Sequence, residues 1–304
     1  MKHVCVVFGG NGKEREVSIS SASSIVSTLK HLNYKVSELD FNENFINDIT
    51  KINPDVVFNA MHGTWGEDGT LPTILNFLKI PYTHSGRKAS IIAMNKEFIK
   101  QIAKSLNIKI NPSYIYTKEQ ILTNNFKKFE KTFIKPCSEG STVGCVRLFE
   151  KELSSEQKNI ISSVEDNFFL VEEFFEGVEV SIAVFKNKAI GGVEIAPKNG
   201  YYDYFSKYTK GQTEYFIPPR ISSTMLQELQ EVALKIHNTI EAKDVSRSDF
   251  LIKNEEYRFL EINTHPGFTA TSLVPKIATY NKISFAEILK SLIEKANFEP
   301  YNKL

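Results

Sequence analysis

The sequence predicts an α/β protein with an open parallel sheet of the Rossmann type at the N-terminus and antiparallel sheets after it. Over roughly the first 85 residues, short apolar segments alternate with segments of helical periodicity, the order expected of parallel strands joined by crossover helices. After about residue 106, strand-like segments follow one another with turns between them, which favours antiparallel pairing. A chain of 304 residues is long enough for two or three packed subdomains.

The predicted N-terminal sheet follows the order β-α-β-α-β. Residues 3–8 (HVCVVF) are continuous, apolar and β-branched, as in a buried parallel strand. The apolar side chains of 16–32 recur at helical spacing, and Asn11 with Glu14 three residues later resembles a pair of capping residues. The other two strands of this part are predicted at 34–41 and 54–63.

The antiparallel part is predicted to begin after one long helix over 88–106. The polar segment 154–166 suits a solvent-facing helix. Residues 197–219 are rich in Tyr, Gly, Lys and Pro without a clear period, and a long irregular stretch of this kind usually forms a functional loop. The strands are predicted at 131–137, 141–149, 168–175, 178–187, 188–197, 245–253 and 257–264, with further helices over 223–240 and at the C-terminus.

Composition and charge argue against several classes of protein. The formal net charge is +1, so neither nucleic acid nor a membrane surface is expected as a partner. No apolar run approaches the ~20 residues of a membrane helix, and the N-terminal segment becomes polar too soon for a signal peptide. Three cysteines without CxxC spacing predict reduced thiols rather than a metal site. We therefore expect a cytoplasmic protein.

The strongest chemical signal lies on two neighbouring strands near the C-terminus. Glu261 and Asn263 are separated by one residue and therefore share a face, and pairing through the turn KNEE brings Asp249 to that face. Oxygen donors without cysteine or histidine suit Mg2+ that holds a polyphosphate. Arg247 lies on the same side and is suited to stabilise a developing oxyanion. The simpler interpretations are a solvated hairpin face for the acids and an ordinary ion pair for the arginine.

Two further features follow this hairpin, in the segment NTHPGFTATSLVP. Gly267 can direct a backbone N–H toward the same oxyanion. Ser272 opens an apolar helix, whose first amides can bind a carboxylate together with the hydroxyl. Taken alone, the two residues would be interpreted as a turn and a helix cap.

Lysines at the ends of predicted elements form the second signal. Lys96 lies on a helix, and Lys135 ends an apolar strand just before a Gly-Ser-Thr loop that can cover phosphates. The segment LVEEFFEGVEVSI then places Glu172 and Glu179 around an apolar bend. A strand edge there suits an adenine ring, and a carboxylate suits ribose hydroxyls. A plain β-hairpin turn is the simpler interpretation of the loop alone.

Two glycine loops lie at the ends of N-terminal strands. The first, which contains Glu14, resembles a phosphate cradle but lacks the G-x-x-x-x-G-K-[ST] spacing. The second, HGTWGEDG, places His62 at the carboxyl end of the third strand, in the crevice where open α/β sheets bind ligands. We expect His62 to position a ligand rather than to react.

Taken together, eight motifs are similar to those of the D-alanine–D-alanine ligase family of the ATP-grasp superfamily, in the same order and spacing. They are GGNGKEREVSISSA, HGTWGEDG, IPYTHSG, AMNK, IKPCSEGSTVG, VEEFFEGVEV, YYDYFSKYT and RSDFLIK…FLEINTHPGFTATSLVP. The resemblance covers nearly the whole chain. It implies a two-part ATP-grasp fold after the Rossmann-like subdomain, with divisions at 1–86, 87–176 and 177–304 and a lid loop at 197–219.

The implied activity is the ATP-dependent joining of two D-alanine molecules through a D-alanyl phosphate, for the synthesis of peptidoglycan precursors by a homodimer. On the nucleotide side the resemblance implies contacts to ATP and to two Mg2+ ions, with Mn2+ as a substitute. The residues that it assigns are Lys96, Lys135 and Lys207 to the phosphates, Glu172, Glu173, Phe174 and Phe175 to adenine, Glu179 to ribose, and Asp249, Glu261 and Asn263 to the metal ions.

On the amino-acid side, the resemblance assigns Glu14 to the ammonium group of the first D-alanine. The opening glycine loop would thus serve the amino acid, whereas ATP would bind between the later antiparallel units. The other assignments are His62 to positioning of the substrate, Ser141 and Tyr208 to tying the lid loop to this site, Arg247 and the Gly267 amide to the tetrahedral intermediate, and Ser272 with the Leu273 amide to the carboxylate of the second D-alanine.

Three positions depart from the family pattern. Pro72 follows GEDG where many relatives carry glutamine, Asn95 stands where Asp is frequent, and His265 stands where a small or apolar residue is common. The Lys207–Tyr208 pair is retained, which predicts a dipeptide product rather than the ester of D-alanyl-D-lactate ligases. The chain could also be an ATP-grasp ligase for a different carboxylate and amine, or a non-catalytic nucleotide-binding protein, which the retained charged residues disfavour.

Overall fold

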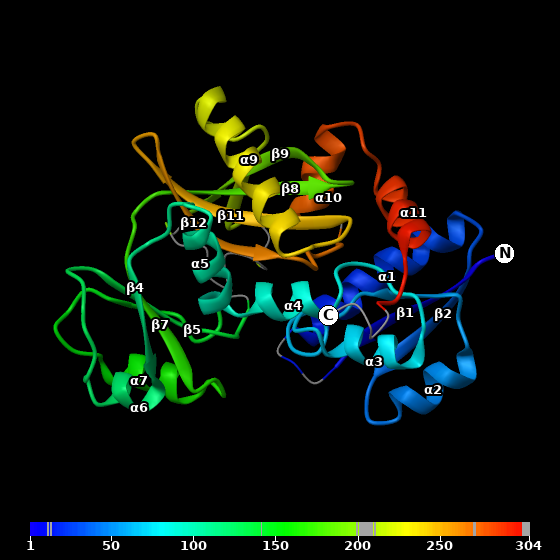
Figure 1. The fold of residues 1–304 in the computed structure, drawn as a ribbon, viewed down its shortest axis with the longest axis horizontal. Coiled ribbons are helices and arrows are strands. Elements are labelled where there is room, and N and C mark those ends of the chain that lie inside the picture. Colours follow the sequence, from blue (N-terminus) through cyan, green and yellow to red (C-terminus); the bar gives the residue numbers. More distant parts are fainter. Residues whose placement is uncertain are drawn as a thin grey trace.

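The computed structural model describes residues 1–10, 12, 14–140, 142–198, 200, 209, 211–269 and 272–299. Within these residues the chain forms one parallel and two antiparallel sheets, each covered by helices (Figure 1). This mixed architecture confirms the predicted fold class. No helix in the described part of the chain is both long enough and apolar enough to cross a membrane.

The first sheet is parallel, with strand order β2-β1-β3. Val4 and Val6 of β1 pack toward α1, whereas Cys5 and Val7 pack toward α2 and α3. Because both faces of the strand are covered, its sequence is continuously apolar. The elements are β1 (His3–Gly9), α1 (Arg15–His31), β2 (Lys35–Phe41), α2 (Phe45–Ile52), β3 (Val56–Asn59) and α3 (Thr70–Leu78).

The second sheet is antiparallel, with strand order β4-β7-β5-β6, and it lies at the lower left of Figure 1. It has a small apolar core of its own, to which two short helices contribute. The elements are β4 (Ser113–Thr117), α6 (Lys118–Leu122), β5 (Thr132–Pro136), β6 (Val146–Leu148), α7 (Ser155–Ser162) and β7 (Phe168–Glu173).

The third sheet is antiparallel, with strand order β10-β9-β8-β11-β12. One face packs on α4, α5 and α9, and the other shares a core with α1, α10 and α11. The N-terminal sheet and the C-terminal part of the chain are therefore joined by one core. The elements are α4 (Arg87–Met94), α5 (Lys96–Ser105), β8 (Val178–Phe185), β9 (Lys188–Pro197), β10 (Thr213–Phe216), α9 (Ser223–Thr239), β11 (Val245–Lys253), β12 (Glu256–Asn263), α10 (Leu273–Tyr280) and α11 (Phe285–Lys295).

The single helix predicted over 88–106 is wrong, because the structure has two helices there, α4 and α5. Asn95 lies between them with extended backbone (ψ 109°), and its side-chain oxygen accepts hydrogen bonds from the N–H groups of Glu97 and Phe98. When a side-chain amide caps the start of a new helix, its hydrogen bonds compete with continuation of the preceding helix. Apolar periodicity does not reveal such a break.

The predicted capping pair stays a prediction, because Asn11 lies outside the described residues, while Glu14 precedes α1 and makes no side-chain cap hydrogen bond. Two smaller expectations differ from the structure. Strand β10 pairs with β9 within a stretch that was expected to be irregular. The strand predicted over 141–149 shortens to β6, because Thr142 and Gly144 have φ angles of 64° and 72°, which an extended strand excludes.

Candidate active site

A cavity of about 1360 Å³ lies where the three sheets meet. The structure brings together at this cavity every predicted site residue that it describes. These are Glu14, His62, Lys96, Lys135, Glu172, Glu173, Phe174, Phe175, Glu179, Arg247, Asp249, Glu261, Asn263, Gly267, Ser272 and Leu273. The predicted residues Ser141, Lys207 and Tyr208 lie outside the described residues.

The hairpin of β11 and β12 carries the predicted metal ligands on one side. Its register pairs Asp249 with Glu261 and Arg247 with Asn263. Cross-strand partners point to the same face, so the alternation in the sequence and the pairing agree. A bulge just after Asp249 shifts the register at the point where the polar residues end.

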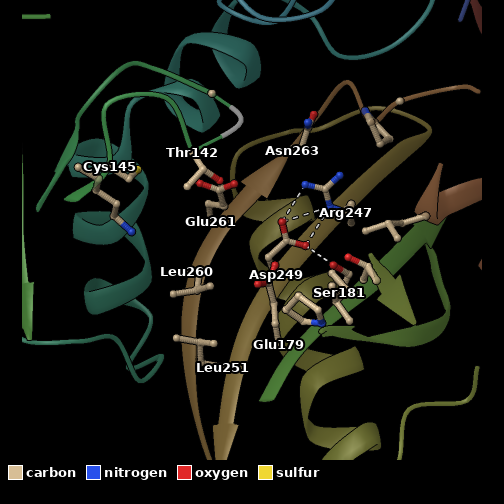
Figure 2. A pocket seen from close by; sticks show the side chains of 18 of the residues that line it. Thr142, Cys145, Glu179, Ser181, Arg247, Asp249, Leu251, Leu260, Glu261 and Asn263 are labelled. Carbon is tan, nitrogen blue, oxygen red and sulfur yellow. Dashed lines mark hydrogen bonds and ion pairs between the residues drawn. The ribbon is translucent and has the colours of Figure 1, made fainter. Parts of the chain in front are cut away.

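Asp249 is held by neighbours on two strands (Figure 2). Arg247 donates from Nε to Oδ1 at 2.9 Å and from Nη2 to Oδ2 at 2.8 Å, and Ser181 of β8 donates its hydroxyl at 2.5 Å. The ion pair that was the simpler interpretation of Arg247 is thus formed. Since both side chains line the cavity, the pair is accessible to a ligand that competes for either charge.

Lys96 connects three parts of the site. It begins α5, its Nζ donates to the carbonyl oxygen of Glu139 in the glycine loop after β5, and it lies 3.9 Å from Oε2 of Glu261. Only 9% of its side chain is exposed, although it lines the cavity. A lysine in this position places positive charge between the loop and the carboxylates of β12.

A second group of charges is buried beside the first. The Glu172 carboxylate of β7 accepts hydrogen bonds from Lys135 of β5, at 2.7 Å, and from Lys100 of α5. All three side chains are nearly inaccessible to water. Sequence reasoning missed Lys100, which lies one helical turn after Lys96 beside apolar residues, and this i, i+4 spacing is the signal that would have found it.

Burial and pairing act in opposite directions on this group. Burial disfavours the Glu172 carboxylate, but the two lysines outweigh it and lower its pKa to about 2. Burial, with the charge of Lys135 nearby, lowers the pKa of Lys100 to about 8. Burial also opposes the charge of Lys135, yet the Glu172 carboxylate raises its pKa overall. The Glu172 carboxylate therefore keeps Lys135 charged, and at neutral pH it keeps Lys100 charged as well. Both cations are fixed behind the cavity.

Glu14 lines the cavity and lies between two glycines. A Cβ added to Gly63 would be 2.9 Å from Oε2 of Glu14, and one added to Gly140 would be 3.5 Å away. Gly63 also has a φ of +66°, which L side chains rarely adopt. The loop after β3 therefore approaches the carboxylate more closely than a side chain would allow.

His62 lies between Ser21 and Glu67 in the same region. Its Nε2 is 2.9 Å from the Ser21 hydroxyl, and its Nδ1 is 3.3 Å from Oε1 of Glu67. A Cβ on Gly267 would be 2.9 Å from the Ser272 hydroxyl and 3.5 Å from Cε1 of His62. The three predicted residues His62, Gly267 and Ser272 are thus neighbours, although they come from opposite ends of the chain.

Two buried histidines beside them were not predicted as site residues. The ring of His265 lies 4.1 Å from that of His84, centroid to centroid, and its Nε2 is 2.8 Å from the carbonyl oxygen of Asn59. Burial lowers the pKa of His265 to about 4 and also lowers that of His84. Both rings are therefore neutral at physiological pH.

Known proteins share both the sequence and the shape of this chain. Residues 103–294, more than half of the chain, match a family model described as the C-terminus of D-ala D-ala ligase. The chain belongs to the D-alanine–D-alanine ligase family. It is 42% identical over 294 residues to the D-alanine–D-alanine ligase of Wolbachia pipientis wMel, with 96% of this chain and 93% of that protein covered. The corresponding protein of Rhizobium meliloti is 39% identical over 305 residues, with 97% and 98% covered.

A solved structure agrees with the assignment at the level of the fold. The D-alanine–D-alanine ligase from Bacillus anthracis complexed with ATP aligns with a TM-score of 0.80 at 24% identity, over 97% of each chain. The predicted family and the predicted ATP-grasp architecture are therefore both confirmed. The matching segment 103–294 contains the whole second and third sheets, and with them the hairpin of β11 and β12.

Proposed function

We propose that this chain joins two D-alanine molecules to D-alanyl-D-alanine, with conversion of ATP to ADP and phosphate. One observation carries the proposal, namely that residues suited to two unlike ligands line a single cavity. Lysines and oxygen donors suited to a nucleotide and its metal line it together with Glu14 and His62, which suit an amino acid. Relatives that carry the name D-alanine–D-alanine ligase at 39–42% identity support the same reaction.

ATP is proposed to lie across the second and third sheets, with its phosphates at Lys96, Lys135 and Lys207. The ATP complex of the Bacillus anthracis ligase, which has the same fold, supports a nucleotide in this cavity. Glu179 is proposed to bind the ribose, and residues 172–175 to frame the adenine ring. Because the Glu172 carboxylate already holds two lysines, its part is to fix those cations.

The residues of the β11–β12 hairpin fit two Mg2+ ions. Asp249 and Glu261 supply carboxylate oxygens and Asn263 an amide oxygen, which are the hard donors that Mg2+ prefers. The Asn263 oxygen accepts a hydrogen bond from the His265 N–H at 2.7 Å, which orients it and leaves its second lone pair for a cation. When bound, Mg2+, or Mn2+ in its place, would neutralise the charge that passes to ADP.

The proposed reaction has two steps. A carboxylate oxygen of the first D-alanine attacks the γ-phosphorus of ATP, ADP leaves, and D-alanyl phosphate forms. The second D-alanine, after its ammonium group has lost a proton, attacks the carbonyl carbon, and phosphate leaves. Arg247 and the Gly267 N–H would stabilise the oxyanion, and Ser272 with the Leu273 amide would bind the second carboxylate. A lid at 197–219 would exclude water, which otherwise hydrolyses the acyl phosphate.

The remaining proposals concern organisation and setting. The subdomain division at 1–86, 87–176 and 177–304 assigns one sheet to each part, which supports it. A homodimer in the cytoplasm is proposed, with the dipeptide consumed in the synthesis of peptidoglycan precursors. D-alanine and ATP are the proposed partners, and neither nucleic acid nor a membrane is invoked.

The decisive experiment compares the two stereoisomers of alanine. With ATP and Mg2+, the protein should release phosphate with D-alanine and not with L-alanine, and mass spectrometry should find one D-alanyl-D-alanine per phosphate. Arg247→Met should lower kcat by about 10²–10³-fold, the usual loss for one oxyanion donor. Lys253→Met, on the same hairpin but exposed and outside the cavity lining, is the matched control and should retain activity. Release with both stereoisomers, or with neither, contradicts the proposal.

A further inference from the structure

Three side chains converge where the loop after β3 meets the loop after β12. His62, Glu67 and His265 each contribute one donor atom, and these atoms lie within 4.8 Å of one another. His62 and His265 are 7% and 3% exposed, and 13% of the Glu67 side chain is exposed. Two imidazoles and one carboxylate form a donor set that differs in chemistry from the all-oxygen set of the β11–β12 hairpin.

The hydrogen bonds of His265 determine which of its nitrogens is available. Its Nε2 is 2.8 Å from the carbonyl oxygen of Asn59, and a carbonyl oxygen only accepts, so Nε2 carries the proton. Nδ1 consequently keeps its lone pair. It is buried and has no hydrogen-bond partner among the described residues. An unpaired buried acceptor is costly and needs an explanation, which a ligand provides.

His62 is held in a comparable way. Its Nε2 is 2.9 Å from the Ser21 hydroxyl, and its Nδ1 is 3.3 Å from Oε1 of Glu67. The Glu67 carboxylate only accepts, so Nδ1 carries the proton in the structure. The Ser21 hydroxyl accepts as readily as it donates, so the proton moves to Nε2 when a cation displaces it from Nδ1 and binds between Nδ1 and the Glu67 carboxylate. Histidines that bind a metal through one nitrogen nearly always donate the other N–H to an oxygen. Both imidazoles of this group have such an oxygen in place.

We propose that Nδ1 of His62, Nδ1 of His265 and the Glu67 carboxylate form a binding site for a divalent transition-metal ion of the zinc type. Zinc takes two imidazoles and a carboxylate as three of four tetrahedral ligands, whereas Mg2+ and Ca2+ select oxygen alone. His62 and Glu67 line the cavity, so the fourth position opens toward the cavity. An ion there ties the loop after β3 to the loop after β12 and removes His62 from substrate positioning.

The test measures metal binding rather than turnover. Protein saturated with Mg2+, so that the hairpin oxygens are occupied, is titrated with Zn2+ against a chromophoric chelator, and separately with Co2+. We expect one equivalent of tightly bound Zn2+ and the intense visible absorption of tetrahedral Co2+. His265→Gln and Glu67→Gln should each weaken Zn2+ binding by at least about 10–100-fold, and Ser21→Ala by about 10-fold. Zn2+ should also raise the Tm of the parent protein but not of His265→Gln.

A surface histidine provides the matched control. His31→Gln removes an exposed imidazole from the C-terminal end of α1 and should leave Zn2+ affinity unchanged. Equal Zn2+ affinity in the parent protein and in both His265→Gln and Glu67→Gln overturns the proposal. So does a Co2+ spectrum of the parent protein that lacks tetrahedral intensity, a result that does not depend on whether any variant folds. Neither outcome bears on the ligase reaction, which uses other metal ligands.

Discussion

Two groups of buried side chains at the cavity are stabilised in opposite ways. The lysine group consists of Lys96, Lys100, Lys135 and Glu172. The histidine group consists of His62, Glu67, His84 and His265. In the first, a carboxylate is fixed between two ammonium groups. In the second, the rings of His84 and His265 pack against each other, and His62 and His265 bond to hydroxyl and carbonyl oxygens.

This difference matches the two ligands proposed above, a polyanion at the lysine group and a small zwitterion beside the histidine group. Buried charges are tolerated only when paired, so the lysine group keeps a permanent positive field at the price of a rigid ion network. The neutral rings of His84 and His265 need no counter-charge. The lysine group is therefore expected to be sensitive to loss of one partner, and neutral buried histidines to be sensitive to acid.

The largest effect is expected from breaking the ion network. Glu172→Gln leaves Lys100 and Lys135 buried without the carboxylate to which both are bonded, which should lower the free energy of unfolding by about 3–5 kcal/mol. Urea denaturation at pH 7 measures it. Glu173→Gln is the matched control, because Glu173 is the next residue on β7 and is exposed, and it should change stability by less than about 0.5 kcal/mol. Equal losses in the two variants would contradict the assigned role of Glu172.

An intermediate effect is expected from acid on a neutral histidine. His237 of α9, outside the cavity lining, bonds to the Ser246 hydroxyl at 2.7 Å, and burial lowers its pKa to about 4. The folded state thus binds fewer protons than the unfolded state, whose histidine pKa is about 6.5, so stability is lost as pH falls from about 6.5 toward 4. Between pH 7 and pH 5 this histidine should account for about 1–2 kcal/mol.

The comparison of variants isolates that contribution. In urea denaturation at pH 7 and pH 5, His237→Gln should lose less stability than the parent protein, whereas His31→Gln, which removes an exposed histidine, should follow the parent. Glu172 does not contribute in this interval, since its pKa is lowered to about 2 and its unfolded value is about 4.3. An unchanged pH dependence in His237→Gln would show that the ring is not held neutral.

The sequence was sufficient where function follows from strand periodicity. Asp249, Glu261 and Asn263 could be predicted to share a face because side chains alternate along strands, and the register of β11 and β12 agrees. Lys135 could be placed because it ends an apolar strand before a glycine loop. These inferences need only the period of two and the position of a turn.

The histidine group could not be predicted in the same way. His62 and His265 are far apart in the sequence, and they meet only because α10 and α11 pack the C-terminal segment against the N-terminal sheet. His265 was recognised as a departure from the family pattern, but its contact with Asn59 depends on that packing. Similarly, Asn95 divides two helices through a local hydrogen bond that competes with helix continuation.

The smallest effect is expected from the close approach of Gly63 to the Glu14 carboxylate. Gly63→Ala places a Cβ at a φ of +66° and 2.9 Å from the Glu14 carboxylate. The backbone strain should lower stability by about 1 kcal/mol, and displacement of Glu14 should raise KM for D-alanine while KM for ATP is unchanged. Gly12→Ala, with no described atom within 4 Å of the new Cβ, is the control. Steady-state kinetics with each substrate varied in turn make the measurement, and an equal rise in both KM values would mean that Glu14 does not serve the amino acid alone.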